Sequence, residues 1–264
     1  MIKIQCFIAN NKNSATIKNM DDKSLNKYIA ETGVCSRRDA DTYIDAGRVT
    51  LNGAVARKGN RVGAGDEVLL DGQPLVAKPD TIYIALNKPR GITCTTDLKD
   101  PSNIIDFLSL EQRIFPIGRL DKPSDGLIFL TNDGDIVNKI LRAGNNHEKE
   151  YVVTVDKPFD DAFIVQMRNG VAILDTVTQP CVVQREGAKK FRIVLTQGLN
   201  RQIRRMCETL GYQVQTLTRL RIMNVSLAGL PLGKWRYFTP EEVAEINALV
   251  NNSSKTEEAS VFEE

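Results

Sequence analysis

One aspartate stands in a loop that could present it for chemistry. Asp121 lies in the segment 118–126, which is rich in glycine and proline and comes directly before the apolar run 127–130. A loop held by a rigid strand is a common platform for catalytic groups. Arg119 and Lys122 lie close in sequence, and positive neighbours favour an ionised carboxylate. On its own, however, the pattern favours an aspartate whose side chain stabilises a turn.

The other reactive residue types lack a recognisable arrangement. His147 is the only histidine, and its polar surroundings favour a loop residue over a catalyst. The five cysteines, at positions 6, 35, 94, 181 and 207, form no Cys-x-x-Cys pair. This spacing argues against a zinc site and a disulfide framework, and it favours free thiols in a reducing cytoplasm. No phosphate-binding glycine loop is recognisable. We therefore expect neither a metal nor a cofactor.

A second carboxylate in the same loop raises the alternative of a glycosidase. Such enzymes hold two carboxyl groups roughly 5 to 10 Å apart across a sugar ring. Asp125 lies in the same tight loop as Asp121, and Trp235 is the only tryptophan that could stack on a sugar. The sequence therefore disfavours this alternative.

The charges are unevenly distributed along the chain, although the net charge is only +2. The segment 185–236 holds eleven basic residues and two acidic ones, whereas 241–264 holds seven glutamates and one lysine. A segment this basic suggests a polyanionic partner, and a solvated basic face is the alternative. No apolar run is long enough for a membrane span. The polar segment 1–22 is expected to be a poorly ordered extension without a signal peptide.

Residues 23–73 are expected to form a small separate module. Ser24 and Ser36 are predicted N-caps of two short helices, of which the second spans about 37–46. Short apolar runs follow, separated by Asn52-Gly53 and by Asp71-Gly72, which are tight-turn signals. Arg37 and Arg38, in the first turn of the second helix, could clamp a phosphate backbone. Two ordinary surface arginines are the alternative.

A linker at 74–80 is expected to lead into a larger domain at 81–250. Strands are predicted at 82–86, 127–130, 151–155 and 191–195, and helices at 135–142, 160–169, 201–210 and 240–250. Strand runs mixed with fewer helices indicate the α+β class, with a mostly antiparallel mixed sheet flanked by helices. The acidic segment 251–264 is expected to be a disordered tail.

Three motifs in this order resemble the pseudouridine synthases of the RsuA type, which carry an N-terminal S4 RNA-binding domain. They are Gly118-Arg-Leu-Asp121, Lys149-Glu-Tyr151, and the run from Leu195 to Met206 that contains Arg-Gln-Ile-Arg. The segment 24–72 resembles the S4 domain itself. The resemblance covers about 24–248 and is greatest to the F-type branch that acts on large-subunit (23S) rRNA.

This resemblance implies roles for individual residues. Asp121 would be the catalytic aspartate, Tyr151 the tyrosine that packs against the target base, and Arg204 the basic partner of the aspartate. Leu195 would support the base. The RNA contacts implied by the motifs are Arg119, Leu120, Lys122, Arg201, Gln202 and Ile203, with Arg37 and Arg38 on the S4 domain.

The resemblance also implies a reaction and a partner. Uridine would be isomerised to pseudouridine in 23S rRNA stem-loop RNA, with a tRNA stem-loop as a possible second substrate, by a cytoplasmic monomer. The alternative from another class is a non-catalytic S4-domain protein for RNA binding or ribosome assembly. Loss of Asp121, Tyr151 or Arg204 would have favoured that alternative, and all three are present.

Overall fold

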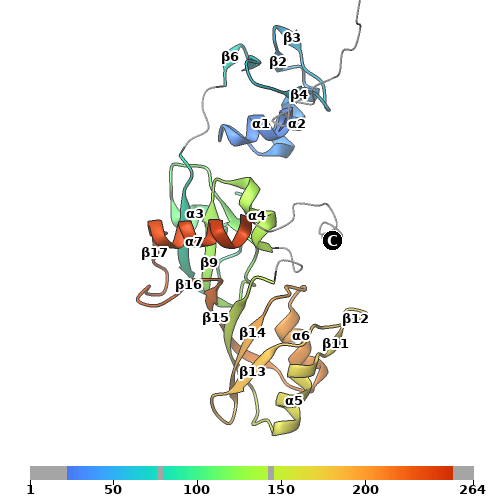
Figure 1. The fold of residues 1–264 in the computed structure, drawn as a ribbon, viewed down its shortest axis with the longest axis vertical. Coiled ribbons are helices and arrows are strands. Elements are labelled where there is room, and N and C mark those ends of the chain that lie inside the picture. Colours follow the sequence, from blue (N-terminus) through green and yellow to red (C-terminus); the bar gives the residue numbers. More distant parts are fainter. Residues whose placement is uncertain (1–22, 76–79, 142–145, 252–264) are drawn as a thin grey trace, which may run out of the picture. The chain divides into compact units, whose positions relative to one another are not determined.

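The computed structural model describes residues 23–75, 80–141 and 146–251. The chain divides into two compact units, Met1–Lys78 and Pro79–Glu264, and each is described by itself (Figure 1). The expected extension 1–22 and most of the expected linker and acidic tail lie outside the described residues. Pro74 ends a strand of the first unit and Asn251 ends a helix of the second, so these two residues belong to regular structure.

The first unit packs two short helices against short strands. The helices are α1 (Leu25–Glu31) and α2 (Arg37–Asp45), and their apolar faces meet one hydrophobic core. A four-stranded antiparallel sheet has the order β3-β2-β5-β6, and a separate two-stranded sheet pairs β1 with β4. The strands are β1 (Lys23–Ser24), β2 (Val49–Leu51), β3 (Ala54–Val55), β4 (Arg61–Val62), β5 (Val68–Leu70) and β6 (Gln73–Pro74).

Local sequence signals account for most of these boundaries. Ser36 caps α2 in a reciprocal arrangement: its Oγ accepts from the Asp39 N–H at 3.1 Å, and the Asp39 carboxylate accepts from the Ser36 N–H. Ser24 precedes α1, but its side chain makes no capping hydrogen bond. Asn52 and Gly53 both have positive φ, as the Asn-Gly signal requires for a tight hairpin.

The second unit is built on one nine-stranded sheet. Its main path runs β13-β14-β10-β15-β9-β7-β17, with β16 beside β15 and β8 beside β9. Every pairing is antiparallel except that of β15 with β9. The strands are β7 (Tyr83–Lys88), β8 (Phe115–Ile117), β9 (Asp125–Thr131), β10 (Lys149–Val155), β13 (Val182–Arg185), β14 (Lys190–Leu195), β15 (Val214–Ile222), β16 (Val225–Ser226) and β17 (Trp235–Tyr237).

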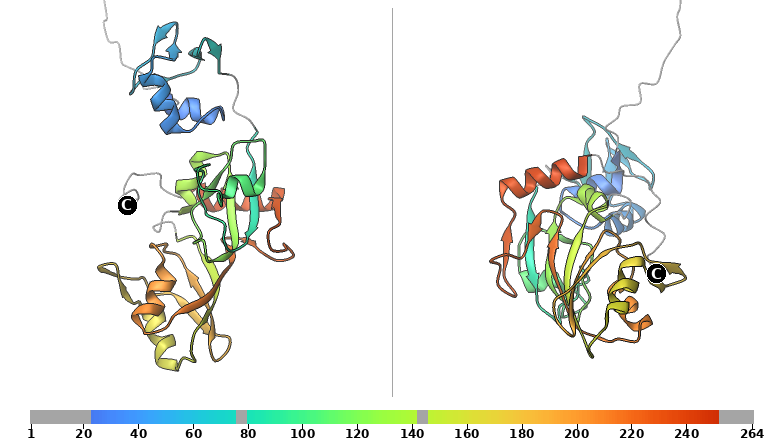
Figure 2. Two further views of the ribbon diagram at one scale, coloured as in Figure 1. Left: turned by 180° about the vertical axis from the view of Figure 1, so that it is seen from behind. Right: turned by 60° about the horizontal axis from the view of Figure 1, so that its bottom comes forward.

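Helices cover this sheet in two groups. The helices are α3 (Ile104–Leu108), α4 (Gly134–Leu141), α5 (Asp161–Asn169), α6 (Gln202–Thr209) and α7 (Pro240–Asn251). Helices α4 and α7 share one core with one face of β7 and β9, whereas α3, α5 and α6 belong to a larger core on the other face (Figures 1 and 2). A small hairpin, β11 (Ala172–Ile173) with β12 (Thr176–Val177), follows α5. The unit has the mixed α+β architecture expected from the sequence.

The parallel pairing divides the sheet into two halves. Strands β7, β8, β9 and β17 form the first half, and β10, β13, β14, β15 and β16 form the second (Figure 1). Between β9 and β15 only two residue pairs are in register, Thr218 with Asp125 and Arg219 with Gly126. Gly126 has a φ of +110°, and a Cβ atom there would lie 2.3 Å from the Arg219 carbonyl oxygen. The two backbones can therefore meet at this point only because residue 126 is glycine.

The longest strand of the sheet has no counterpart among the strands predicted from the sequence. In β15, polar residues such as Thr216, Thr218 and Arg221 break up the apolar pattern. Arg219 is nevertheless buried at 4% exposure, because its Nε donates to the Leu127 carbonyl at 2.6 Å. The strand thus carries a buried cation where the sequence pattern indicates only a basic surface.

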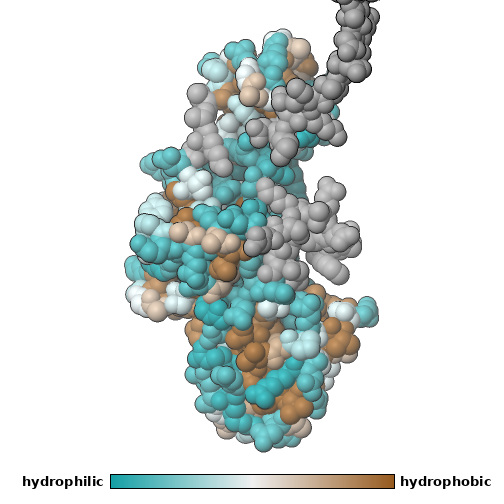
Figure 3. Space-filling model, in the orientation of Figure 1, coloured by the Kyte–Doolittle hydropathy of each residue, from teal (hydrophilic) through white to brown (hydrophobic). Residues whose placement is uncertain are grey.

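The basic segment 185–236 forms a less charged surface than its composition predicts. Acidic side chains from elsewhere in the chain neutralise part of it: Glu150 pairs with Arg192 and with Arg221, the latter at 2.8 Å. Further ion pairs join Arg185 to Asp161, Lys190 to Glu186 and Arg236 to Glu242. The visible surface is mixed, with apolar side chains gathered over β13 and β14 (Figure 3). The charge count of this segment therefore overstates the net positive charge that it presents.

Candidate active site

The loop that carries Asp121 is fixed by backbone contacts on both sides. The Ser124 N–H donates to the Asp121 carbonyl at 2.9 Å, which closes a tight turn. The Gly91 N–H, just after β7, donates to the Lys122 carbonyl at 2.8 Å. The Cys94 thiol lies 3.3 Å from the Leu120 carbonyl oxygen and 3.4 Å from the Leu120 nitrogen. The loop therefore holds the Asp121 carboxyl group, which is about one-third exposed at 34%, in a defined place.

Arg204 contacts this carboxylate from the other half of the sheet. It lies on α6 with its side chain only 9% exposed, and its Nε is 3.4 Å from Asp121 Oδ2. Its Nη2 donates to Ser124 Oγ at 2.8 Å, and its Nη1 donates to the Val214 carbonyl at 3.3 Å. Burial lowers the pKa of the Arg204 guanidinium, and the neighbouring Asp121 carboxylate acts against this lowering. The two groups form a partly buried ion pair.

A second arginine approaches the same carboxylate from the solvent side. Arg201 Nη1 lies 3.6 Å from Asp121 Oδ2, and 42% of the Arg201 side chain is exposed. Arg201 precedes α6 in the left-handed conformation, with a φ of +50°. A non-glycine residue in this region is strained by about 1 kcal/mol or more, so the surrounding loop must hold it there. Asp121 thus faces one buried and one exposed cation.

Tyr151 stands beside this pair on β10. Its ring is partly buried, and its strand neighbours are Ile193 and Arg219. The Arg219 guanidinium carbon lies 5.9 Å from the centre of the Tyr151 ring. Positive charge at this distance is attracted to an aromatic face. The buried Arg219 therefore lies beside the Tyr151 ring.

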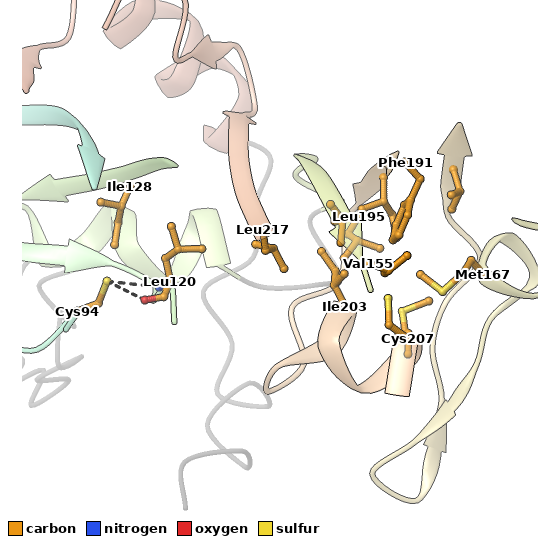
Figure 4. Packing of buried hydrophobic residues seen from close by; sticks show 14 of the residues in the cluster. Cys94, Leu120, Ile128, Val155, Met167, Phe191, Leu195, Ile203, Cys207 and Leu217 are labelled. Carbon is orange, nitrogen blue, oxygen red and sulfur yellow. Dashed lines mark hydrogen bonds between the residues drawn. The ribbon is translucent and has the colours of Figure 1, made fainter. Parts of the chain in front are cut away.

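A cavity of about 90 Å³ brings these groups together. Asp121, Tyr151 and Arg204 line it with apolar side chains that come from both halves of the sheet. Leu217 lies between Leu120 on one side and Leu195 and Ile203 on the other (Figure 4). The remaining lining residues are Arg119, Ser124, Gln197, Gly198, Leu199, Arg201 and Gln202. The cavity combines an ion pair, an aromatic ring and an apolar floor.

The predicted RNA contacts differ in accessibility. Arg119, Lys122 and Arg201 are exposed, whereas Leu120, Gln202 and Ile203 are buried and line the cavity from within. Gln202 also holds the adjacent loop, because its Oε1 accepts from the Leu199 N–H at 3.0 Å. Arg37 and Arg38 are exposed on the first unit, where they are placed at the start of α2.

The sequence reasoning missed five residues of the cavity lining, which are Ser124, Gln197, Gly198, Leu199 and Leu217, and Ser124 is the one among them that forms a hydrogen bond with a predicted catalytic group. Ser124 is fully buried and contacts Arg204 across 80 residues of sequence. Only its place three residues after Asp121 could have suggested a role. The sequence does not show that Arg204 is its partner, because the contact joins the two halves of the sheet.

The larger hollow on the second unit has a different character. It measures about 370 Å³ and is lined by Tyr83, Asp133, Tyr237 and Phe238 among others. The Tyr83 hydroxyl donates to the Asp133 carboxylate at 2.9 Å, so these polar groups already satisfy each other. The smaller cavity is the better candidate site because it holds the predicted catalytic groups.

No metal-binding group of three or more His, Cys, Asp or Glu side chains is found among residues 23–75, 80–141 and 146–251. The four cysteines in these ranges are free thiols. No helix there is long and apolar enough to cross a membrane.

A buried lysine near the site gives a prediction for stability. Burial lowers the pKa of Lys149 to about 8, and Arg219 acts in the same direction. Between pH 8 and about 10.4, the unfolded chain therefore binds more protons at this residue than the folded chain. The contribution of Lys149 to the free energy of unfolding should become more favourable by roughly 2–3 kcal/mol as the pH rises through this window.

Urea unfolding of the wild type and Lys149→Met at pH 7.5 and pH 10 measures this contribution. At pH 7.5 the free energy of unfolding of the variant, relative to that of the wild type, should be higher than at pH 10. A stability difference that stays constant between the two pH values would contradict the lowered pKa.

Comparisons with known proteins identify the family to which the chain is similar. Residues 82–209 match the family of RNA pseudouridylate synthases, and residues 24–68 match the S4 domain. The dual-specificity RNA pseudouridine synthase RluF of Escherichia coli (strain K12) is 58% identical over 232 residues, which cover 87% of this chain and 80% of that protein.

More distant relatives point the same way. The ribosomal large subunit pseudouridine synthase B of Bacillus subtilis (strain 168) is 34% identical over 237 residues, covering 86% of this chain and 97% of that protein. A crystal structure of a pseudouridylate synthase superimposes with a TM-score of 0.61 at 26% identity, covering 86% of this chain and 99% of that chain. With these matches spanning both units, the chain belongs to the RNA pseudouridine synthases, which are isomerases, and it carries the S4 domain of the RsuA type.

Proposed function

We propose that this enzyme isomerises a uridine in stem-loop RNA with Asp121 as the catalytic carboxylate. The observation that carries the proposal is the ion pair between Asp121 and the buried Arg204, 3.4 Å apart, in a cavity that Tyr151 also lines. An aspartate that only stabilised a turn would not need a buried arginine as a partner. The structure does not favour the glycosidase alternative, because the Asp125 carboxylate, which would be the second catalytic group, is bound to Arg90 and Thr218.

The reaction explains why these residue types are needed. Pseudouridine forms when the C1′–N1 bond of uridine breaks, the uracil rotates, and C1′ bonds to C5, from which a proton then leaves. The Asp121 carboxylate either bonds to C1′ after cleavage or removes the C2′ proton. Arg204 places a positive charge beside that carboxylate in a partly closed site. Tyr151 and Leu195 hold the detached base, and Tyr151 is also a general-base candidate for the C5 proton.

The RNA contacts follow from exposure and charge. Arg119, Lys122 and Arg201 are exposed cations around Asp121 and would bind backbone phosphates. Leu120, Gln202 and Ile203 would shape the space that receives a nucleotide turned out of its stack. Arg37 and Arg38 on the S4 domain would hold a second part of the RNA.

The relatives indicate the class of RNA. One is named a ribosomal large subunit enzyme and another is named dual-specificity, so we assign 23S rRNA as the main substrate and a tRNA stem-loop as the second. Both RNAs are found in the cytoplasm, where we place the enzyme. We propose that it acts as a monomer, since residues of one chain supply the lining of the candidate cavity. Selection of the uridine itself rests on RNA shape and splayed bases.

Mapping of pseudouridine in rRNA and tRNA from cells without the gene tests this assignment. A position in 23S rRNA should lose its pseudouridine and regain it with the wild-type gene, but not with Asp121→Asn. A second position should behave the same way in tRNA. If no RNA position changes, the protein acts as a non-catalytic RNA-binding or ribosome-assembly factor instead.

Replacing Arg204 separates its proposed role from simple RNA binding. Arg204→Ala should lower kcat by about 10²-fold or more, because the variant loses a charge next to the reacting groups. RNA affinity should change by less than about threefold, since only 9% of this side chain is exposed. Steady-state kinetics and RNA titration measure the two effects. Equal losses in turnover and affinity would make Arg204 a phosphate contact.

A further inference from the structure

The two partners of the ion pair belong to different halves of the sheet. Asp121 lies in the loop that leads into β9, in the first half, whereas Arg204 lies on α6, which packs against β15 in the second half. The halves are joined in register by only two residue pairs between β9 and β15. Neither half alone therefore fixes the distance between the carboxylate and the guanidinium.

Ser124 makes a direct side-chain link across this junction. Its Oγ accepts a hydrogen bond from Arg204 Nη2 at 2.8 Å, and its N–H donates to the Asp121 carbonyl at 2.9 Å. Ser124 is fully buried. One residue thus connects the loop of the carboxylate with the guanidinium of its partner.

Because of the shape of the guanidinium, the hydrogen bond to Ser124 also orients the Arg204 side chain. The group is planar and its nitrogen positions are fixed relative to one another. Ser124 binds Nη2, and the Val214 carbonyl accepts from Nη1 at 3.3 Å, near the long end for a hydrogen bond. The buried Nε has no hydrogen-bond partner in the described part of the chain, and it lies 3.4 Å from Asp121 Oδ2. Holding Nη2 on Ser124 therefore directs Nε towards Asp121.

We propose that Ser124 is a positioning residue that holds the Arg204 guanidinium with its Nε directed at the Asp121 carboxylate across the junction of the two halves. This inference rests on the proposed function of Asp121 and Arg204. Ser124 itself does no chemistry in this account. It acts on turnover only through Arg204, and that dependence makes the inference testable.

The test is a kinetic comparison of Ser124→Ala, Arg204→Ala and the double variant on a stem-loop RNA substrate. Ser124→Ala should lower kcat about 10- to 100-fold, as expected when a hydrogen bond to a charged group worth roughly 1.5–3 kcal/mol is lost. Its KM and RNA affinity should stay within about threefold. The double variant should be no slower than Arg204→Ala, because the two residues act as one unit.

Thr131→Val supplies the matched control. Thr131 is fully buried on β9, and its hydroxyl donates to the Ile82 carbonyl at 2.7 Å, away from the cavity residues. This variant also loses a buried hydroxyl bond, so its thermal midpoint should fall at least as far as that of Ser124→Ala. Its kcat should match the wild type.

The outcomes separate the inference from the function on which it rests. Three results would each overturn the role of Ser124. The kcat of Ser124→Ala could equal that of the wild type, or Thr131→Val could lose as much kcat as Ser124→Ala. The third is a double variant whose kcat loss is the product of the losses in the two single variants. Full activity of Arg204→Ala would overturn the proposed ion-pair mechanism itself. An inactive Arg204→Ala beside a fully active Ser124→Ala would reject only the positioning role.

Discussion

Asp121→Asn should lower the rate of pseudouridine formation by at least about 10³-fold while RNA affinity stays within about threefold. Asparagine has nearly the same shape as aspartate, so the turn closed by the Ser124 N–H should persist. What is lost is the negative charge, and with it the ability to bond to C1′ or to take the C2′ proton. Binding should not suffer, because the variant removes a negative charge from the neighbourhood of the RNA phosphates.

Single-turnover kinetics and RNA titration measure these two quantities. Asp175→Asn is a suitable control, since Asp175 is exposed in a hairpin turn with a φ of +58°, which asparagine also accepts. The control should be fully active. A comparable rate for Asp121→Asn and the wild type would remove Asp121 from the chemistry.

Gly126→Ala should destabilise the second unit by about 3 kcal/mol or more. Two costs add at this residue. The φ of +110° disfavours any side chain, and the new Cβ would lie 2.3 Å from the oxygen and 2.5 Å from the nitrogen of Arg219. Those atoms belong to the backbone of β15, so they cannot move aside without separating β15 from β9. The substitution should also lower turnover, because this junction sets the distance between Asp121 and Arg204.

Gly229→Ala provides the comparison for this prediction. Gly229 also has a positive φ, +75°, but nothing lies within 4 Å of its virtual Cβ. Its substitution should cost only about 1 kcal/mol from backbone conformation. Urea unfolding of both variants at one pH measures the difference. Equal losses for Gly126→Ala and Gly229→Ala would mean that the close approach of β9 and β15 is not essential.

The sequence indicates a role for Asp121 only when the other motifs of the chain are considered with it. One aspartate in a glycine-rich loop resembles a turn residue, and it becomes a catalytic candidate only when Tyr151 and Arg204 appear in the motifs that follow. The structure brings all three to one cavity. Four helices of the second unit, α4, α5, α6 and α7, and four strands of its nine-stranded sheet, β7, β9, β10 and β14, were also predictable, because their apolar residues recur with regular spacing.

Contacts between distant segments could not be predicted in this way. In β15, Thr218 and Arg219 interrupt the apolar pattern because they bond to groups on β9, namely Asp125 and the Leu127 carbonyl. The same limit applies to the contact between Ser124 and Arg204, since nothing in the sequence near either residue indicates that it contacts the other. Charge counts fail for a related reason, because the acids that neutralise the basic segment include Glu150, on a strand outside that segment.

The most direct test of the central claim follows the C5 hydrogen of the target uridine. The purified full chain is mixed with a 23S rRNA stem-loop whose uridines carry tritium at C5, in a buffer with EDTA and no added nucleotide. Tritium should appear in the solvent over several turnovers, with one tritium released for each pseudouridine found by nucleoside analysis. Asp121→Asn should release none. RNA binding by the wild type without any tritium release or pseudouridine would contradict the account.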